Sequence, residues 1–298
     1  MIKIPKRIKQ RYKQFSKHPL TKGHENHALW RYIYFHFMIK WKKKMIYKWV
    51  GDLKFIARKG EAGIVGNIYY GLFEFEESIF LIHLLNKNDF FLDIGANVGH
   101  YSLLMAGVNN TLSLAIEPVP ATYNKLKENI SLNNLEHLIE FRNIGVSNKN
   151  GMLYFSTDRG TMDRIVDQSY TYSTAVKVET IDSILEDRVP LALKIDVEGY
   201  ENYALEGAVK MLENPDFKVL ILELNSSGKV YGFEDQYIYE KVISYGFKPY
   251  RYEPKNRRLK ELETYNKEQF NTIFVRDLAF VSARLISSDP VKINNHYF

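Results

Sequence analysis

From residue 88 onward, short apolar runs alternate with longer stretches in which apolar residues recur at helical spacing. Short apolar runs indicate strands buried on both faces, and their alternation with amphipathic helices is typical of a parallel sheet. We therefore expect an α/β fold with helices on both faces of the sheet. The predicted strands lie at 90–94, 111–116, 139–144, 191–195, 218–224, 247–252 and 272–275, and the predicted helices at 99–107, 121–132, 200–213 and 235–244. This series is interrupted by a predicted hairpin of 152–157 and 175–178 and by a short helix at 180–186. Segment 253–270 is charged and is expected to lie on the surface outside the sheet.

The first 59 residues follow a different pattern, in which lysines and aromatic residues are interleaved at near-helical spacing. This pattern predicts a basic, aromatic-rich helical extension over 1–59, followed by one domain over 60–298. Segments 55–60 and 66–75 are expected to be a hairpin or irregular cover before a helix at 76–85. The longest apolar part of the extension is broken by His36 and Lys40, so it falls short of the roughly 20 residues that a membrane span needs.

Charge is distributed very unevenly along the chain. Residues 1–59 contain 17 Lys or Arg against only Glu25 and Asp52, a net of +15, whereas the remaining residues contain 24 against 33, a net of −9. Three interpretations of the basic extension stay open. Residues 1–50 could contact an anionic membrane as interfacial helices do, they could hold nucleic acid, or they could pack on the domain with solvated lysines. Cysteine is absent, which excludes disulfides and thiolate chemistry and favours a cytoplasmic protein, peripheral at the inner membrane face under the first interpretation.

A glycine-rich turn follows the first predicted strand and opens the first predicted helix. Such a turn is a general platform for cofactors, because glycine lets a ligand approach the backbone closely. Its spacing, with Gly95 and Gly99 four residues apart, differs from the G-x-G-x-x-G of dinucleotide sites, and no Gly-Lys-Ser/Thr of a P-loop follows. Asp93 at the strand end would repel a phosphate but favour the sulfonium and ammonium of S-adenosylmethionine; alternatively, it is only a structural cap. The turn residues Gly95, Ala96, Asn97 and Gly99 are thus expected to bind that cofactor.

A second carboxylate supports this prediction. Glu117 ends the next strand, 24 residues after Asp93, close to the roughly 20-residue interval at which an acidic residue accepts hydrogen bonds from a ribose diol. Two carboxylates at adjacent strand ends suit a nucleoside that carries positive charge elsewhere.

The sequence resembles the FkbM-type methyltransferases, a branch of the class I S-adenosylmethionine-dependent enzymes. The resemblance lies in Phe-Leu-Asp-Ile-Gly-Ala-Asn-Val-Gly-His-Tyr-Ser at 91–102, Ile-Glu-Pro at 116–118 and Leu-Lys-Ile-Asp-Val-Glu-Gly-Tyr-Glu at 193–201. It covers about 75–225 and implies a Rossmann-like, seven-stranded, mostly parallel sheet whose last strand is antiparallel, together with O-methylation of a hydroxyl. Asn143 is expected near the adenine, although Arg-Asn-Ile-Gly-Val at 142–146 departs from the smaller residues typical of the family.

Methyl transfer to a hydroxyl needs alignment of the reacting atoms and a base that removes the acceptor proton. Asp196 ends the fourth strand at the edge where ligands bind, so we expect it at the junction of cofactor and substrate. Glu198 is an alternative base. Lys194 would serve only if burial lowered its pKa strongly; otherwise it is an ion-paired strand lysine. Other candidates for substrate contacts are Glu223, Asn225 and His100.

The sequence also bears on a possible metal site and on the methyl acceptor. Asp196, Glu198 and Glu223 could bind a divalent cation through oxygen ligands, but nothing in the spacing demands one, so no metal is expected. The leading prediction is a methyltransferase acting on a hydroxyl of a sugar, glycan, lipid-linked sugar or natural product. Its rivals are a nucleic-acid methyltransferase, disfavoured by the acidic body and by the absence of Asn/Asp-Pro-Pro-Tyr/Phe after the fourth strand, and a non-catalytic nucleotide-binding scaffold.

Overall fold

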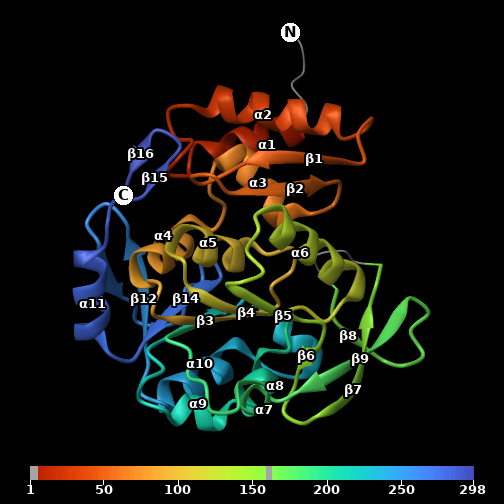
Figure 1. Ribbon diagram of the computed structural model, residues 1–298, viewed down its shortest axis with the longest axis vertical. Helices are drawn as coiled ribbons and strands as arrows, with labels where there is room; N and C mark the ends of the chain where they lie inside the picture. Colours follow the sequence, from red (N-terminus) through yellow and green to blue (C-terminus); the bar gives the residue numbers. More distant parts are fainter. Residues whose placement is uncertain (1–5, 159–162) are drawn as a thin grey trace.

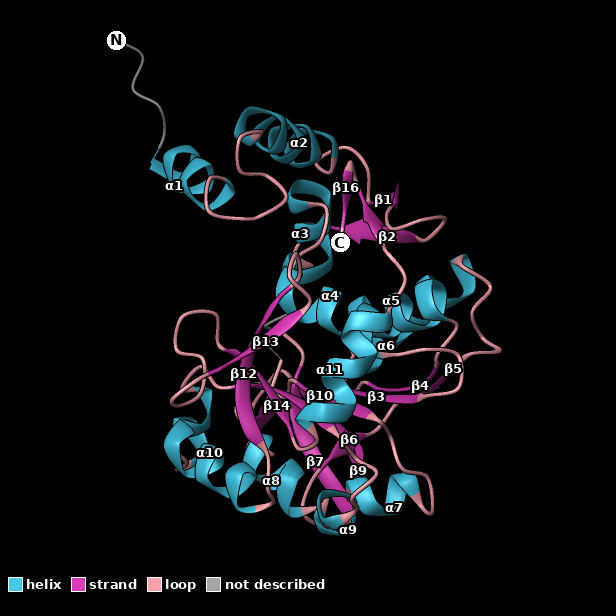
Figure 2. Cartoon of the chain, turned by 90° about the vertical axis from the view of Figure 1, so that its left-hand side faces the viewer, coloured by secondary structure: helices cyan, strands magenta, loops and turns pink. Residues whose placement is uncertain are grey.

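The computed structural model describes residues 6–158 and 163–298, and it places one large sheet between two layers of helices (Figure 1). The N-terminal segment forms a further layer at one end of the molecule, beyond the helices of one sheet face (Figures 1 and 2). This is the α/β architecture expected from the alternation of apolar runs and amphipathic helices.

The large sheet has eight strands in the order β13-β12-β14-β11-β10-β3-β4-β5. Their bounds, from one edge to the other, are β13 (Arg258–Glu261), β12 (Lys248–Glu253), β14 (Asn271–Val275), β11 (Val219–Glu223), β10 (Ala192–Ile195), β3 (Phe90–Ile94), β4 (Leu112–Ile116) and β5 (Ile139–Arg142). Strands β5, β4, β3, β10 and β11 are parallel, and β14 runs antiparallel between β11 and β12. The mostly parallel sheet with its antiparallel last strand is confirmed.

An eighth strand departs from the expected seven. β13 lies within the segment expected to be a surface excursion, and it pairs with β12 at the sheet edge. Its sequence, Arg-Leu-Lys-Glu, has the charged side chains with which natural proteins protect exposed edges from pairing with other chains.

Helices cover both faces of the sheet, which explains why the inner parallel strands β4, β3, β10 and β11 are buried along nearly their whole length. One face carries α4 (Phe75–Leu84), α5 (His100–Asn109), α6 (Pro120–Leu132) and α11 (Leu278–Ser287), and the other carries α7 (Ile181–Leu185), α8 (Glu201–Glu206), α9 (Val209–Glu213) and α10 (Asp235–Ser244). Neighbouring strand residues serve opposite cores: Phe91 packs with the first group and Leu92 with the second. The single helix predicted over 200–213 is divided into α8 and α9 near Gly207.

A smaller four-stranded sheet lies beside β5. It consists of β6 (Gly145–Val146), β7 (Gly151–Ser156), β8 (Ile165–Val166) and β9 (Ser173–Glu179), in the order β6-β9-β7-β8. The predicted hairpin is confirmed as the antiparallel pair of β7 and β9. Phe155, Val176 and Val178 from this sheet form their own apolar cluster with Val119, which follows β4. The small sheet is therefore placed against the end of the central strands.

The N-terminal layer combines helices with a hairpin. It contains α1 (Lys6–Phe15), α2 (Glu25–Met38), β1 (Lys44–Lys48), β2 (Lys54–Arg58) and α3 (Ala62–Tyr70). No helix in the described part of the chain is long and apolar enough to cross a membrane. The C-terminal strands β15 (Lys292–Ile293) and β16 (His296–Tyr297) lie beside this layer (Figure 1), and the ring of Phe298 lies 5.0 Å from that of Phe75 at the start of α4.

The structure corrects two expectations for this region. The helical extension does not continue through residues 44–58, because β1 and β2 pair as antiparallel strands and the side chains of β1 alternate between exposed and partly buried. An alternation with a period of two residues is typical of a strand. In the sequence this period is difficult to recognise, because lysines and aromatic residues occur throughout the segment. Segment 66–75 is irregular only in part: residues 66–70 belong to α3, in which Ile68 and Tyr69 are buried, and the bends at 71–74 lead into α4. Residues 55–58 lie in a hairpin as expected, because they belong to β2.

Candidate active site

The glycine-rich turn lies at the carboxyl end of β3, packed against the end of β10. Gly95 has a left-handed backbone, φ +78°, and a Cβ at this position would lie 1.8 Å from the carbonyl oxygen of Asp196. Only glycine allows the two chain segments to approach so closely. The backbone amides of Gly95 and Ala96 both donate to the carbonyl of Ile116 at 3.0 Å, which anchors the turn to the end of β4.

Glu117 is held at the end of β4 by backbone amides. Its Oε2 accepts from the Asn97 N–H at 3.0 Å and its Oε1 from the Val119 N–H at 2.9 Å. Burial raises the pKa of Glu117 to about 7. Asn143, expected to touch the adenine, instead donates its Nδ2 to the carbonyls of Glu117 and Pro118, at 2.9 and 2.8 Å. Asn143 therefore shapes the loop that carries Glu117 and is absent from the cavity lining.

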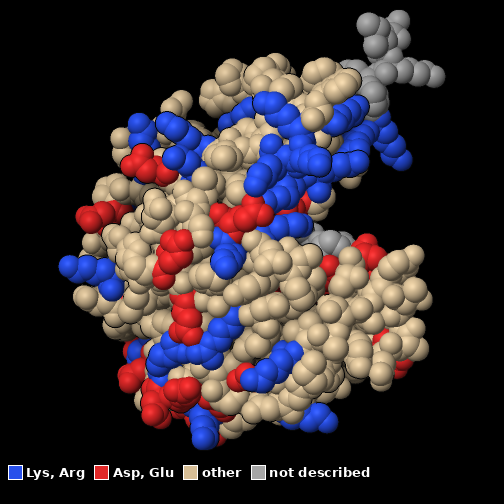
Figure 3. Space-filling view, turned by 45° about the vertical axis from the view of Figure 1, so that its right-hand side comes forward, with Lys and Arg blue, Asp and Glu red and all other residues tan. Residues whose placement is uncertain are grey.

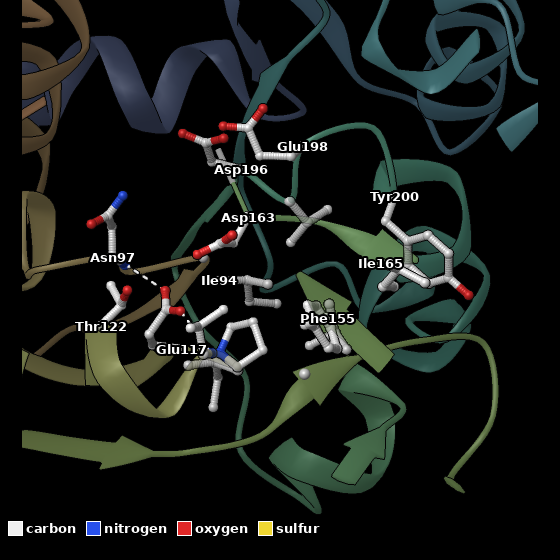
Figure 4. A pocket seen from close by; sticks show the side chains of 17 residues that line it. Ile94, Asn97, Glu117, Thr122, Phe155, Asp163, Ile165, Asp196, Glu198 and Tyr200 are labelled. Atoms are coloured by element: carbon white, nitrogen blue, oxygen red, sulfur yellow. Dashed lines mark hydrogen bonds between the residues drawn. The ribbon is translucent and has the colours of Figure 1, made fainter. Parts of the chain in front are cut away.

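A cavity opens between these strand ends and the small sheet. Four predicted cofactor residues line it: Gly95, Asn97, Glu117 and Asp196. In Figure 4 the carboxyl groups of Asp196 and Glu198 lie together at one end, while Asn97, Glu117 and Thr122 form one side. Phe155, Ile165 and Tyr200 form the opposite, mostly apolar side.

The turn after β10 presents Asp196 and Glu198 to this cavity. Glu198 adopts a left-handed backbone, φ +52°, and is followed by Gly199 at φ +102°. The Oε1 of Glu201 accepts from the backbone N–H groups of Val197 and Gly199, both at 3.2 Å. Glu201 therefore stabilises the turn through these two hydrogen bonds. The strained backbone of Glu198 is of a kind that is found mainly at functional sites.

A buried cation lies at the centre of a group of carboxylates. Lys194 is fully buried on β10, and its Nζ lies 3.6 Å from Asp196 Oδ2. Burial alone would lower the pKa of Lys194, but the carboxylates of Asp196, Glu74, Glu223 and Asp93 outweigh it and raise the pKa above the ordinary value. Lys194 therefore remains charged near neutral pH, which does not suit the base role that the sequence left open for it.

The carboxyls around Lys194 are unequal. Glu223, at the end of β11, has its pKa raised by burial and by the charge of Asp196. Glu198 has its pKa raised to about 7, again by burial first and by Asp196 second. A carboxyl with a pKa near the operating pH is well suited to accept and release a proton.

A smaller cavity adjoins the first and shares Gly95, Asn97 and Asp196 with it. Asp93 and Ala96 line this second cavity rather than the larger one. Asp93 also acts as a cap, because its Oδ2 accepts from the backbone N–H and the hydroxyl of Ser102 in the first turn of α5, at 3.0 and 2.5 Å. Burial raises its pKa to about 6.

Three further predicted residues have structural partners. Gly99 lines neither cavity; its φ of +101° begins α5, and a Cβ there would lie 2.8 Å from the side chain of Leu126. His100 lines the smaller cavity, and its ring nitrogens lie within hydrogen-bond distance of Asn67 and Ser78. Asn225 accepts from the Ser227 N–H at 2.9 Å and closes a local turn away from both cavities.

A metal site at Asp196, Glu198 and Glu223 finds no support in the geometry. Among residues 6–158 and 163–298, no three His, Asp or Glu side chains are grouped as they would be to hold a metal ion. Lys194 occupies the centre of the carboxylates instead.

Residues 93–249 match the Methyltransferase FkbM domain family, more than half of the chain. This chain belongs to the FkbM methyltransferase family. Its match to the methyltransferase sdnD of Sordaria araneosa is 30% identical over 129 residues, 42% of this chain and 49% of that protein. Its match to the hexuronic acid methyltransferase AglP of Haloferax volcanii is 28% identical over 144 residues, 47% of this chain and 58% of that protein. The chain thus spans about half the length of the curated relatives it matches.

A solved structure of an FkbM methyltransferase, from Methylobacillus flagellatus KT, is also similar. It aligns with a TM-score of 0.44 and 15% sequence identity, covering 84% of this chain and 59% of that one.

FkbM methyltransferases use S-adenosylmethionine, and the larger cavity has features that fit this cofactor. Gly95, where the turn approaches the end of β10 most closely, lines this cavity. The side-chain Oδ1 of Asn97, which lines both cavities, is buried without a hydrogen-bond partner among the described residues. A buried polar atom of this kind needs a partner, which a bound ligand would supply.

The sequence reasoning missed several residues that line the cavities. Glu74, at the junction of α3 and α4, reaches the smaller cavity beside Lys194 from a left-handed backbone, φ +49°. The signal for it was a lone carboxylate between Phe73 and Phe75 in an apolar stretch. Tyr101, which lines the same cavity, has a buried hydroxyl that interacts with the Glu74 carboxyl group. Asp163, in a polar loop without periodicity, gave no signal.

Proposed function

We propose that this FkbM methyltransferase methylates a hydroxyl group of a sugar or a sugar-containing acceptor, with Glu198 as the general base. The observation that carries the proposal is the position of Glu198 beside Asp196 at one end of the cofactor cavity, with a pKa raised to about 7. A hydroxyl is a poor nucleophile until its proton is removed, and a carboxylate that titrates near neutral pH can accept that proton.

The residues that line the two cavities have distinct expected roles in binding the cofactor and orienting the acceptor. When bound, S-adenosylmethionine supplies an electrophilic methyl group. Glu117 and Asn97 would hold the nucleoside end, because both line the larger cavity and offer oxygen acceptors. Lys194 would fix the orientation of Asp196 through the contact of 3.6 Å between them. Asp196 would in turn orient the acceptor at the meeting point of the two cavities, which both include it.

A sugar acceptor is supported by one relative, whose name describes it as a hexuronic acid methyltransferase. A hexuronic acid offers two oxygen nucleophiles, a hydroxyl and a carboxylate. Only the hydroxyl needs a base, since a carboxylate is already an anion at neutral pH. A catalytic carboxylate with a pKa near 7 therefore favours a hydroxyl as the methylated group.

The test combines cofactor binding with methyl transfer. Calorimetry should show binding of S-adenosylmethionine to the wild-type chain, and labelled methyl from S-adenosylmethionine should appear on glycosides of glucuronic or galacturonic acid. A methyl ether survives mild alkali whereas a methyl ester is hydrolysed, so alkali treatment identifies the methylated oxygen. Neutral glycosides and transfer RNA complete the panel of acceptors.

Glu198→Gln should bind the cofactor as the wild type does but lose about 10²- to 10⁴-fold in the rate of methyl transfer. Glu234→Gln, a surface variant outside both cavities, should change neither. Alkali-labile product would refute the hydroxyl acceptor, and transfer to RNA alone would favour a nucleic-acid substrate. Full activity of Glu198→Gln would exclude Glu198 as the base.

A further inference from the structure

Helix α2 is apolar on two opposite faces, although only one of them packs on the protein. Its inner face, with Ala28, Tyr32 and Phe35, is buried against the rest of the N-terminal layer. Its outer side chains recur at the same helical spacing, continue just past its end, and are exposed: Trp30 (64%), Ile33 (48%), Tyr34 (41%), Phe37 (59%) and Trp41 (81%). We name these five residues the outer stripe. Contiguous exposed apolar residues of this extent mark an interaction site.

Basic residues border the outer stripe. Lys40, Lys42, Lys43 and Lys48 are exposed, and in the described part of the chain none of them forms an ion pair with a carboxylate. Between residues 6 and 51 the only acidic residue is Glu25, at the opposite end of α2 from these lysines. Figure 3 shows Lys and Arg gathered over the part of the molecule formed by the N-terminal layer, with most acidic side chains further away.

We propose that the outer stripe and its bordering lysines dock this protein on an anionic membrane surface. Tryptophan and tyrosine rings partition to the level of the headgroups, apolar side chains enter the acyl boundary, and lysines bind anionic lipid. The outer stripe and its bordering lysines together provide all three kinds of side chain on one exposed surface. Residues Ile33 and Phe37 give this surface an apolar character that phosphate-binding surfaces do not need.

A second copy of the chain fits the surface less well. Two-fold contact would bring the same patch of both copies together. The layer that carries the stripe has a net charge of +15 over residues 1–59, so lysines would face lysines. Like charges placed opposite each other in an interface are unfavourable, whereas an anionic bilayer neutralises them.

The position of the stripe connects it with the candidate active site through a single helix. The second half of α3 packs beneath α2, where the ring of Tyr69 lies 5.1 Å from that of Tyr32 and the Tyr69 carbonyl accepts from Arg31 at 2.8 Å. The first half of α3 contributes Gly63 and Ile64 to the lining of the smaller cavity, beside Asp196. Docking would therefore hold that cavity close to the membrane, which suits a lipid-linked acceptor. This last step rests on the proposed function, whereas membrane docking does not.

Vesicle co-sedimentation tests the proposal with the full chain. We expect binding to vesicles of equimolar phosphatidylcholine and phosphatidylglycerol, weak binding to phosphatidylcholine alone, and loss of binding at high salt. Replacing Lys42, Lys43 and Lys48 together by Gln should weaken binding about fivefold for each lysine removed. The triple change Trp30→Ser, Phe37→Ser and Trp41→Ser should abolish it. Wild-type tryptophan fluorescence should shift to the blue on anionic vesicles and be quenched by brominated lipid.

Matched controls use other exposed residues of the same kinds. Met152→Ser with Ile286→Ser removes two exposed apolar side chains elsewhere, and Lys255→Gln with Lys260→Gln removes two exposed lysines of the body. Neither control should change vesicle binding. Thermal unfolding and calorimetry with S-adenosylmethionine on every variant separate a docking defect from a folding or cofactor defect.

Three results would overturn the proposal. One is equal sedimentation with both vesicle types that the stripe and lysine variants leave unchanged. Another is no vesicle binding together with a dimer that the stripe variant dissociates, which would assign the surface to a second copy. The third is binding of RNA in preference to vesicles through the same lysines. Failure of methyl transfer to sugars, with docking intact, would refute only the proposed acceptor.

Discussion

Asn97 and Glu198, which both line the larger cavity, share a backbone conformation that residues other than glycine rarely adopt. Both adopt left-handed backbones, at φ +52°. Asparagine tolerates this conformation well, whereas glutamate does so at a cost of about 1–3 kcal/mol. At Glu198 the surrounding hydrogen bonds of Glu201 and the glycine that follows maintain the turn. The strain directs a carboxylate with a shifted pKa into the cavity.

Gly95→Ala should remove cofactor binding. The new methyl group would collide with the Asp196 carbonyl, a backbone atom that cannot move aside alone, and φ would be unfavourable for alanine. We expect at least a tenfold loss of S-adenosylmethionine affinity by calorimetry and a destabilisation of about 1–3 kcal/mol in unfolding experiments. Gly151→Ala is the matched control, since no atom lies within 4 Å of a Cβ there. Wild-type affinity in Gly95→Ala would show that the turn is not the binding site.

Methyl transfer should depend on pH through Glu198. Because a base must be deprotonated to act, the rate should rise as pH increases through about 7 and level off above it. Asp196→Asn removes a negative charge that helps to raise the pKa of Glu198, so the rise should move to lower pH, even as the rate itself falls. The measurement is kcat against pH for both proteins. A flat profile between pH 6 and pH 8, spanning roughly the range expected for a pKa near 7, would contradict the assignment.

At the scale of elements, burial rather than residue type separates the two faces of α2. Phe35 and Phe37 are two residues apart and chemically identical, yet they are 2% and 59% exposed. The ring of Phe35 packs within 6.2 Å of the Tyr47 and Tyr69 rings, whereas Phe37 belongs to the outer stripe. The same helix therefore has one face that stabilises the fold and one that is free to interact with other partners.

Alanine substitution should separate these faces. Phe35→Ala should lower the free energy of unfolding by about 3–5 kcal/mol, because it empties a filled site in the core. Phe37→Ala should change it by less than about 0.5 kcal/mol, as an exposed substitution does. Urea unfolding of the two variants, followed by circular dichroism, makes the comparison. Equal losses of stability would mean that the outer face also packs on the protein.

At the scale of the whole molecule, the N-terminal layer and the methyltransferase fold share one apolar core. A single cluster of buried residues runs from Phe15 in α1 and Phe35 in α2 to Leu103 in α5 and Val281 in α11. Few charged contacts add to it, such as Lys44 with Glu128 at 2.9 Å. The predicted division at residue 59 marks a change in composition, and we propose that it is not a boundary between separately folding units.

Unfolding should therefore occur in one cooperative transition. Scanning calorimetry should show a single peak, because a continuous core couples the layer to the sheet. S-adenosylmethionine at 100 times its dissociation constant should stabilise the whole protein by about 2.7 kcal/mol and shift the peak without splitting it. Two resolved peaks, only one of them moved by the cofactor, would show that residues 1–59 fold as an independent unit.

Local patterns along the chain are sufficient to predict the central sheet, the order of its helices and the cofactor turn. The patterns are an apolar run of five residues, a helical period, and glycines where the chain must bend after a strand. Because parallel strands bring their carboxyl ends to one edge, Asp93, Glu117 and Asp196 can be assigned to a common site from the sequence alone. The family resemblance, which rests on the same segments, leads to the same cofactor.

Tertiary packing, in contrast, determines which of these side chains face the cavity and what charge they carry. Asp93 caps α5 and Asn143 holds a loop in place, so neither lines the larger cavity. Lys194 stays charged because four carboxylates from different elements converge on it. Glu74 joins that group from a segment more than 100 residues before Lys194 in the sequence. Pairing of β1 with β2, and burial of one face of α2 but not the other, likewise depend on contacts with distant residues. Burial and electrostatic fields are properties of the packed chain, so no local pattern in the sequence contains them.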